Sequence, residues 1–107
     1  MNFEISTTRR FDRELKRLVK KYPSLKKEYA DLISKLKEEP TFGKPIGMDC
    51  YKIRMSVASK NGGKSGGFRA ITHIKITQKN VYLLSIYDKT EQETLKDHEI
   101  LKILKQI

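Results

Sequence analysis

Residues 51–57, YKIRMSV, alternate strictly between apolar or aromatic side chains and polar ones. Because successive side chains of a β-strand point to opposite faces of its sheet, the pattern predicts a strand that sends every second residue into a core. The other face carries Lys52, Arg54 and Ser56, and an apolar core does not accept unpaired cations. A sheet built around this strand must therefore leave its cationic face to solvent or to an anion.

A glycine-rich connection and a second alternating segment follow this strand. Residues 59–67, SKNGGKSGG, predict a flexible loop, and residues 68–76, FRAITHIKI, predict the paired strand, with Arg69 on its second face. The loop resembles a phosphate-binding loop at residues 63–65. However, position 58 is alanine where that motif requires glycine, and no helix follows. The loop is therefore not expected to bind a nucleotide.

The N-terminal third predicts a short strand and two helices. Side chains alternate over residues 2–6, and two apolar stripes at helical spacing follow, separated by Pro23. Thr7 or Thr8 is expected to cap the first helix, and Ser24 the second. The stripes are Phe11, Leu15, Leu18, Val19 and Tyr22, then Leu25, Tyr29, Leu32, Ile33 and Leu36. This arrangement predicts a helical hairpin with both stripes buried.

The remaining segments predict one more strand and a last helix. Residues 41–48 contain two glycines and a proline and predict a loop. Residues 78–80 predict a tight turn, and residues 81–87, VYLLSIY, predict a central strand covered on both faces. Asp97 is expected to cap the last helix. Its apolar stripe is Ile100, Leu101, Leu104 and Ile107.

Together these segments predict one domain over residues 1–107, with the order βααβββα. The class is α+β, with an antiparallel-rich sheet, an N-terminal helical hairpin and a C-terminal helix. Because the helices fall on one side, one face of the sheet is expected to be open. A chain of 107 residues can bury a single core and little more.

The charge of the chain points to an anionic partner. The formal net charge is +10, from 23 Lys and Arg against 13 Asp and Glu, and the largest excess falls within residues 40–79. Excess positive charge attracts polyanions, although it does not choose among RNA, DNA, an acidic membrane or an acidic protein. The first predicted helix adds outward cations that form either a solvated face or a grip on phosphates or an acidic partner. They are Arg9, Arg10, Arg13, Lys16, Arg17, Lys20 and Lys21.

Cysteine content and hydropathy indicate an intracellular location. No apolar run approaches a membrane span and no signal-peptide pattern begins the chain, so a cytoplasmic protein that makes no use of a membrane is expected. Cys50 has no partner for an internal disulfide, which fits a reducing compartment. A half-buried residue beside the first core strand is the simpler interpretation of Cys50, because a catalytic thiol needs an activating neighbour.

No residue pattern predicts a metal or another cofactor. His73 and His98 do not have the spacing of a ligand pair, and His73 is interpreted as structural or peripheral. The acidic run of Asp88, Glu91 and Glu93 is more typical of the segment that leads into a helix.

Four cations, Lys52, Arg54, Arg69 and Lys89, remain as candidates for a reaction without metal. RNA carries its own nucleophile, the 2′-hydroxyl, which must be oriented and deprotonated while the phosphorane is stabilised and the leaving oxygen protonated. Arginine suits the phosphorane because its planar fork matches two phosphate oxygens. A lysine can act as base only where nearby cations and partial burial favour its neutral form. A sheet that only binds RNA would carry the same cations, although such sheets usually add exposed aromatic residues.

Three segments resemble the RelE/ParE superfamily of bacterial toxins, and its HigB-like branch in particular. They are residues 49–54, DCYKIR, residues 67–69, GFR, and residues 83–89, LLSIYDK. The resemblance implies a RelE-like fold and a type II toxin that cleaves mRNA in the ribosomal A site through the RNA 2′-hydroxyl. It also implies a cognate antitoxin as partner, the ribosome and mRNA as targets, and neither metal nor small-molecule cofactor.

The resemblance assigns roles by position. Lys52 corresponds to a lysine proposed as base or charge stabiliser, and Arg54 to a second basic residue. Arg69 matches the phosphate-stabilising arginine, and Lys89 falls where relatives carry an arginine implicated in catalysis.

One position departs from the family pattern, because a tyrosine of some relatives is replaced by Leu95. The proton donor is then unassigned, and Tyr87 is either a substitute or an aromatic residue packed on the last helix. Further candidates for RNA binding are Lys60, Lys64 and Lys75.

Two alternatives stay open. ParE-like relatives poison DNA gyrase, although they lack such a basic strand pattern. The chain could also be a basic module that binds RNA, the ribosome or an acidic partner without catalysis.

Overall fold

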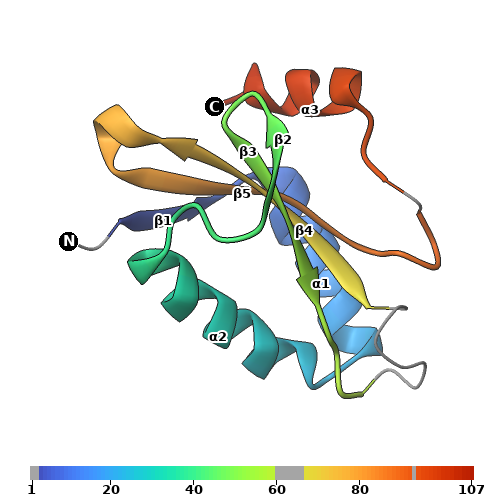
Figure 1. Cartoon of the computed structure of the whole chain (residues 1–107). Helices are drawn as coiled ribbons and strands as arrows, with labels where there is room; N and C mark the ends of the chain where they lie inside the picture. Colours follow the sequence, from blue (N-terminus) through green and yellow to red (C-terminus); the bar gives the residue numbers. More distant parts are fainter. Residues whose placement is uncertain (1–2, 60–66, 93) are drawn as a thin grey trace.

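The computed structural model describes residues 3–59, 67–92 and 94–107 of the chain. In these residues a five-stranded sheet has two helices on one face and a third helix on the other (Figure 1). The elements are β1 (Glu4–Thr7), α1 (Arg9–Lys21), α2 (Leu25–Glu38), β2 (Lys44–Gly47), β3 (Cys50–Met55), β4 (Phe68–Lys75), the 3-10 turn η2 (Ile76–Gln78), β5 (Asn80–Asp88) and α3 (Asp97–Leu104). The strand order is β1-β5-β4-β3-β2, with β1 parallel to β5 and the other pairs antiparallel. The predicted α+β class is confirmed.

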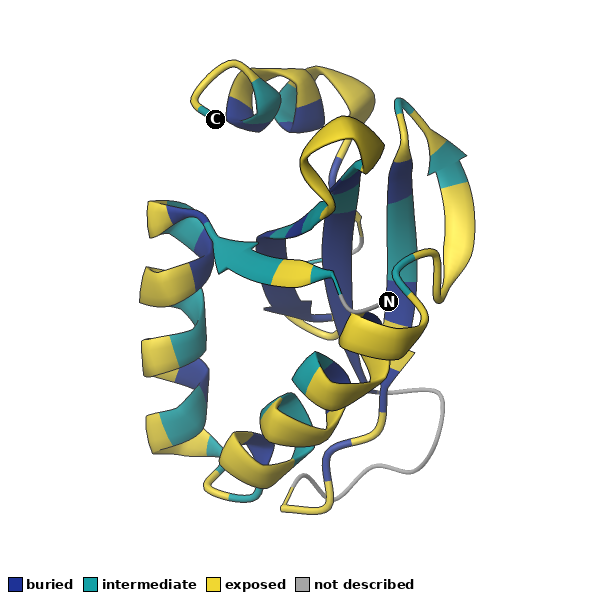
Figure 2. Cartoon of the chain, turned by 90° about the vertical axis from the view of Figure 1, so that its left-hand side faces the viewer, coloured by how far each residue is buried: buried dark blue, intermediate teal, exposed yellow. Residues whose placement is uncertain are grey.

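The larger core lies between the sheet and helices α1 and α2. Phe11 and Leu18 of α1 and Leu25 and Leu36 of α2 are fully buried against strand residues. Figure 2 shows the outward sides of both helices exposed and their inward sides buried. Burial of one such side chain contributes roughly 2 kcal/mol. The two predicted helical stripes therefore form the main core.

A second core lies on the opposite face of the sheet, beneath α3. Ile100 and Ile103 of α3 pack with Ile71 of β4 and Leu84 of β5. The expectation of an open face is therefore wrong over this part of the sheet. The predicted stripe of α3 is also corrected, because Ile103 is buried while Leu101 is 47% exposed. The apolar strand β5 is covered on both faces, as predicted.

The N-termini of the helices use their polar residues in different ways. Thr8 caps α1: its Oγ1 accepts a hydrogen bond from Phe11 N (3.0 Å) and donates to Leu84 O (3.0 Å). Ser24 occupies the cap position of α2 but makes no capping hydrogen bond. Its Oγ instead accepts from Ser59 N (2.8 Å), which ties α2 to the segment after β3. At α3 the cap residue is Lys96, and the expected cap Asp97 is the first helical residue.

The segment expected to be a loop over residues 41–48 contains an additional edge strand. β2 pairs with β3 through a two-residue turn at Met48 and Asp49, whose φ angles are 59° and 56°. Two consecutive left-handed residues are the geometry of tight hairpins that match the strand twist. The expected turn at residues 78–80 is replaced by η2, followed by Lys79 in the left-handed region. Ile76 leaves the strand pattern and is 68% exposed.

The described helices are all too short or too polar to cross a membrane.

Candidate functional site

The strand register places three of the predicted site residues in one row across the sheet. Arg54 of β3 lies opposite Arg69 of β4, and Arg69 lies opposite Tyr87 of β5. Directly opposed residues point to the same face, with Cβ atoms roughly 5 Å apart. Two arginines therefore face each other, although like charges in this relation are destabilising. Such a pair becomes favourable when an anion lies between them.

Arg69 is a buried cation. It is 5% exposed, and its Nη1 donates a hydrogen bond to the carbonyl of Phe68 (3.1 Å). Arg69 forms no ion pair with any residue in the described ranges 3–59, 67–92 and 94–107. A buried charge without a counter-charge is costly. A bound anion would supply such a counter-charge.

Lys52 and Arg54 lie beside a hollow near the edge of the sheet. Lys52 is half-buried, follows the same face as Arg54, and is opposed by Ile71. The hollow has a volume of about 290 Å³ and is lined by Phe42, Gly43, Lys44, Lys52, Ile53 and Arg54. Gly43 has φ +113°, and a Cβ there would lie 2.9 Å from the Lys52 carbonyl. A glycine at position 43 is therefore needed for the chain to pass this close to β3.

Phe42 adds an aromatic ring to this side of the site. Its side chain is 38% exposed, and Lys35 Nζ lies 5.2 Å from the ring centroid. Sequence patterns did not single out Phe42 because it falls in an irregular segment between two elements. An exposed ring beside cations is what base stacking on a protein surface requires.

Lys89 reaches the same end of the sheet from β5. It follows Asp88 directly, its side chain is exposed, and its backbone N–H donates to the carbonyl of Gly67 (3.3 Å). Gly67 immediately precedes β4, and a side chain there would run into the carbonyl of Met55. The close passage at Gly67 therefore brings Lys89 to the strand ends that carry Arg54 and Arg69. The sequence carried no direct signal for this role of Gly67.

Two acidic residues fix the segment that carries Lys89. The buried carboxylate of Asp88 accepts hydrogen bonds from Thr90 N (3.0 Å), Thr90 Oγ1 (2.8 Å) and Tyr22 Oη (3.4 Å). Glu91 accepts from Arg17 Nη2 (3.0 Å) and Lys21 Nζ (3.4 Å) of α1. The segment is thus tied to α1 as well as to the sheet.

The ion pairs of Glu91 change the acidity of their partners. The hydrogen bond from Arg17, helped by Lys21, lowers the pKa of Glu91, and the hydrogen bond to Glu91 raises the pKa of Lys21. Asp88 and Glu91 were interpreted as a helix lead-in, but Glu91 pairs with α1 instead. The third acid, Glu93, lies outside the described residues. Within the described part of the chain, no group of three His, Cys, Asp or Glu side chains is arranged to hold a metal ion.

Tyr87 lies beneath α3. It is 3% exposed and belongs to the second core, together with Leu95 and Ile100. Its buried hydroxyl has no hydrogen-bond partner among the described residues. Tyr87 therefore packs on the last helix, which was the second of the two interpretations of this residue from the sequence. It can reach a substrate only if the covering segment moves.

Cys50 and His73 lie on the same face but farther from the arginines. Cys50 is 1% exposed, more buried than expected, and burial raises the pKa of its thiol to about 11. The Sγ donates to Met48 O (3.4 Å), and His73 Nδ1 lies 3.0 Å from the same oxygen. Cys50 Sγ also lies 3.6 Å from His73 Nδ1, but burial of the thiol and its raised pKa keep it protonated near neutral pH, which fits the structural interpretation of Cys50.

The structure separates Lys75 from the other predicted residues. Lys75 lies six positions along β4 from Arg69, roughly 20 Å at the rise of a strand, and its Nζ lies 5.5 Å from the ring centroid of Tyr82. Lys60 and Lys64 lie outside the described residues. Arg54 and Arg69 lie directly opposite each other. Lys52 lies two residues along β3, and Lys89 follows the end of β5. We call these four residues the cleavage cluster.

Solved structures show the same fold. A mutant of the E. coli toxin RelE in the free state matches 100% of this chain and 99% of its own, with 20% identity and a TM-score of 0.67. The isolated E. coli RelE toxin matches with 18% identity, a TM-score of 0.62, and 97% of each chain covered. A chain of the intact E. coli RelBE toxin–antitoxin complex matches 80% of this chain and 95% of its own, with 23% identity and a TM-score of 0.52.

No protein-family model matches the sequence, and no curated protein matches it significantly. The similarity to RelE at these identities is a similarity of fold. It agrees with the RelE-like architecture that the sequence motifs predicted.

Proposed function

We propose that this chain is the toxin of a type II toxin–antitoxin system and cleaves mRNA in the ribosomal A site. The observation that carries the proposal is the cross-strand pair of Arg54 with the buried Arg69, which forms no ion pair with any residue that the structure describes. The fold shared with RelE toxins supports the same assignment. The expected partners are a cognate antitoxin, as RelE has in the RelBE complex, together with the ribosome and mRNA in the cytoplasm.

The proposed reaction begins at the 2′-hydroxyl of the message, which attacks the adjacent phosphate and releases the 5′-oxygen of the next nucleotide. Arg69 and Arg54 bind the non-bridging oxygens and stabilise the added negative charge of the phosphorane. Lys52, which is half-buried beside Arg54, is proposed to orient the 2′-hydroxyl and to take its proton as a neutral amine. RNA supplies its nucleophile, and these cations supply charge stabilisation, so the proposal requires neither a metal nor another cofactor.

The leaving oxygen needs a proton, and two residues are candidates. Lys89 is exposed at the same end of the sheet, whereas the hydroxyl of Tyr87 is covered. Lys89 is therefore the better-placed donor, and Tyr87 could act only after the covering segment moves. Phe42 is placed to stack on a base next to the cleaved bond.

A second candidate is a basic module that binds RNA or the ribosome without cutting. The covered Tyr87 favours it, because one of the two candidate donors is then out of reach and a cationic site can bind phosphate without cleaving. This candidate predicts binding to ribosomes with A-site messages left intact.

Primer-extension mapping of translated mRNA after brief expression tests the cleavage. We expect cuts within translated frames for the native chain and none for Arg69→Ala. Lys75→Ala is the matched control, because it removes a cation from the same strand at the other end of the sheet. Arg54→Ala provides a second, exposed site variant if Arg69→Ala is poorly folded.

Cuts that persist in a folded Arg69→Ala chain contradict the assigned role of Arg69. Growth arrest with intact mRNA and induced DNA damage favours the gyrase-poison alternative.

A further inference from the structure

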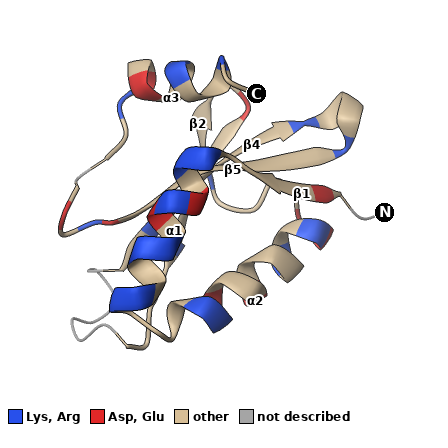
Figure 3. Cartoon of the chain, turned by 180° about the vertical axis from the view of Figure 1, so that it is seen from behind, with Lys and Arg blue, Asp and Glu red and all other residues tan. Residues whose placement is uncertain are grey.

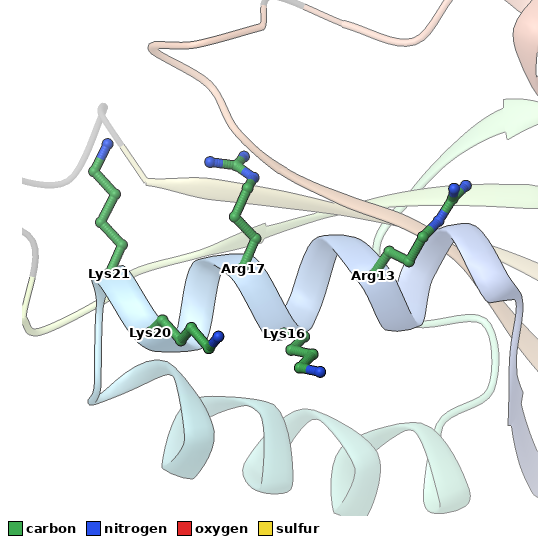
Figure 4. Close-up of a pocket in the computed structure, with 5 residues that line it drawn as sticks. All are labelled: Arg13, Lys16, Arg17, Lys20 and Lys21. Atoms are coloured by element: carbon green, nitrogen blue, oxygen red, sulfur yellow. The ribbon is translucent and has the colours of Figure 1, made fainter.

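The outward face of α1 carries five cations that the proposed cleavage does not use. Arg13, Lys16, Arg17, Lys20 and Lys21 line a shallow concavity of about 530 Å³ (Figure 4). All five side chains are exposed. Figure 3 shows Lys and Arg, in blue, along the length of α1, with acidic residues, in red, between some of them. We call this set the α1 surface.

The five side chains form two rows. Arg13, Arg17 and Lys21 follow one another at four-residue intervals on one side of the helix, and Lys16 and Lys20 do so on the other (Figure 4). The rows extend over eight residues, about 12 Å at the rise of a helix. The α1 surface is therefore long enough to contact several successive phosphates.

The acidic residue within this stretch of α1 is turned away from the α1 surface. Glu14 Oε1 accepts hydrogen bonds from Ser85 Oγ (2.8 Å) and Ile86 N (3.2 Å) of β5, and Arg10 pairs with its other oxygen. The carboxylate of Glu14 therefore interacts with β5 and Arg10, and with none of the five cations of the α1 surface. The other acid of this helix, Asp12, is exposed and lies one turn before Lys16, but it forms no ion pair with any described residue.

Glu91 compensates only part of the charge. It pairs with Arg17 and Lys21, while Arg13, Lys16 and Lys20 form no ion pair with any described residue. Three cations are thus available to an external anion. Both ion pairs of Glu91 are solvent-exposed, so a phosphate can replace the carboxylate at small cost.

The composition of the concavity favours RNA over a protein. Its five lining residues are all Lys or Arg. The centre of a protein interface is rich in aromatic and apolar residues and poor in charges. A nucleic-acid backbone is bound chiefly by charge and by hydrogen bonds to phosphate.

The α1 surface and the candidate cleavage cluster lie on opposite sides of the sheet, because α1 packs on the face of Phe68, whereas Arg69 shares the other face with Tyr87. Tyr22, which follows α1, packs edge-on against Phe68 with ring centroids 5.3 Å apart, and its hydroxyl contacts Asp88. Phe68 precedes Arg69, and Asp88 precedes Lys89. Because neighbouring residues of a strand point to opposite faces, an RNA strand bound along α1 would reach the Arg69 side chain only around the end of the sheet.

We propose that the α1 surface is a docking site for the sugar–phosphate backbone of structured RNA, separate from the cleavage cluster. It binds without reading base sequence, on the side of the sheet opposite to the Arg54 and Arg69 side chains. The proposal goes beyond cleavage, since docking persists if the chain binds RNA without cutting it.

The test uses a short 2′-O-methyl RNA hairpin, which has no free 2′-hydroxyl and cannot be cut. The variant combines Arg13→Gln, Lys16→Gln and Lys20→Gln, which keeps helix propensity and leaves the Glu91 pairs intact. The control combines Lys27→Gln, Lys37→Gln and Lys102→Gln, three exposed cations outside the α1 surface. Both chains lose three charges, and thermal unfolding checks that both are folded.

We expect the variant to weaken hairpin binding at least about tenfold and to lower the slope of log affinity against log salt by about 2. The control should change affinity less than about twofold. An equal loss in the control would overturn the proposal, because net charge alone would then explain binding. Binding of polyglutamate as tight as that of RNA, lost in the same variant, would also overturn it and indicate an acidic protein partner.

Arg69→Ala separates this proposal from the proposed function. We expect it to abolish cleavage while it keeps most of the hairpin affinity. If the native chain binds the hairpin through the α1 surface but cuts no message, docking stands and the cleavage proposal fails.

Discussion

Arg54 on β3 and Arg69 on β4 are directly opposed, so two guanidinium groups share one face of the sheet. Because like charges in this position destabilise a sheet, Arg54→Gln should raise the free energy of unfolding by up to about 1 kcal/mol. The same change should reduce cleavage, because it removes one of the two arginines that are proposed to bind the phosphate. Urea unfolding and a ribosome cleavage assay measure the two effects.

Lys75→Gln is the matched control for the effects of Arg54→Gln on the free energy of unfolding and on cleavage. It removes a cation from β4 at a position opposed by Asn80 rather than by a cation. Neither stability nor cleavage should change appreciably. A loss of stability in Arg54→Gln would show that the arginine pair is not repulsive in the free protein.

Gly67 should be intolerant of any side chain. A Cβ at this position would meet the carbonyl of Met55, which belongs to the neighbouring strand and cannot rotate away. We expect Gly67→Ala to cost about 2 kcal/mol or more and to displace Lys89, whose N–H bonds to the Gly67 carbonyl. Thermal unfolding measures the cost.

Gly47→Ala provides the comparison. Gly47 has φ +91°, but a Cβ at this position would meet no atom within 4 Å, so the cost of the substitution is conformational and about 1 kcal/mol. Equal costs at the two glycines would contradict the steric explanation for Gly67.

The helical hairpin, the strands β3, β4 and β5 and the apolar stripes of α1 and α2 could be predicted, because each depends on a local sequence pattern. Alternation gave the faces of β3, and 3.6-residue spacing gave the stripes of α1 and α2. β2 was missed because a four-residue edge strand that contains a proline and a glycine resembles a loop. Its pairing with β3 depends on the left-handed backbone conformation of Met48 and Asp49, which no turn motif in the sequence predicted.

The candidate site was predictable to the extent that it lies on strands. Strand alternation predicted that Lys52, Arg54 and Arg69 share one face. It did not predict that Arg69 is buried or that it lies opposite Tyr87. Those depend on the register among β3, β4 and β5, which is set by tertiary packing. Phe42 depends on how an irregular segment folds back, so periodicity does not reveal it.

The ion pairs of Glu91 should make stability weakly dependent on pH. The pKa of Glu91 is lower in the folded chain, chiefly because of Arg17, so its contribution is present above the pKa of the unfolded chain. The contribution is lost as pH falls through the lowered pKa of the folded chain. Because the side chain is 38% exposed, we expect at most about 0.5 kcal/mol.

Glu91→Gln tests this effect. The native chain should be slightly more stable than the variant near neutral pH, and the difference should vanish in acid and in high salt. A difference that persists in acid would show that Glu91 stabilises through packing rather than charge.

Cys50 should be nearly unreactive in the folded protein. Burial raises the pKa of its thiol to about 11, so the reactive thiolate is rare near neutral pH and is also covered. A thiol-specific disulfide reagent should modify the native chain far more slowly than the urea-unfolded chain. Fast modification of the native chain would contradict the buried position, and loss of cleavage in a folded Cys50→Ala variant would contradict a structural role.

The buried hydroxyl of Tyr87 should be removable without harm to the fold. It has no hydrogen-bond partner among the described residues, and an unsatisfied buried hydroxyl costs about 1 kcal/mol or more. Tyr87→Phe keeps the ring packed among Leu95 and Ile100, so the free energy of unfolding should rise by about that amount. Because Lys89 is the better-placed donor, we expect cleavage to be largely retained in Tyr87→Phe and lost in Lys89→Ala. The reverse result, in chains that fold equally well, would show that α3 moves during the reaction and that Tyr87 protonates the leaving oxygen.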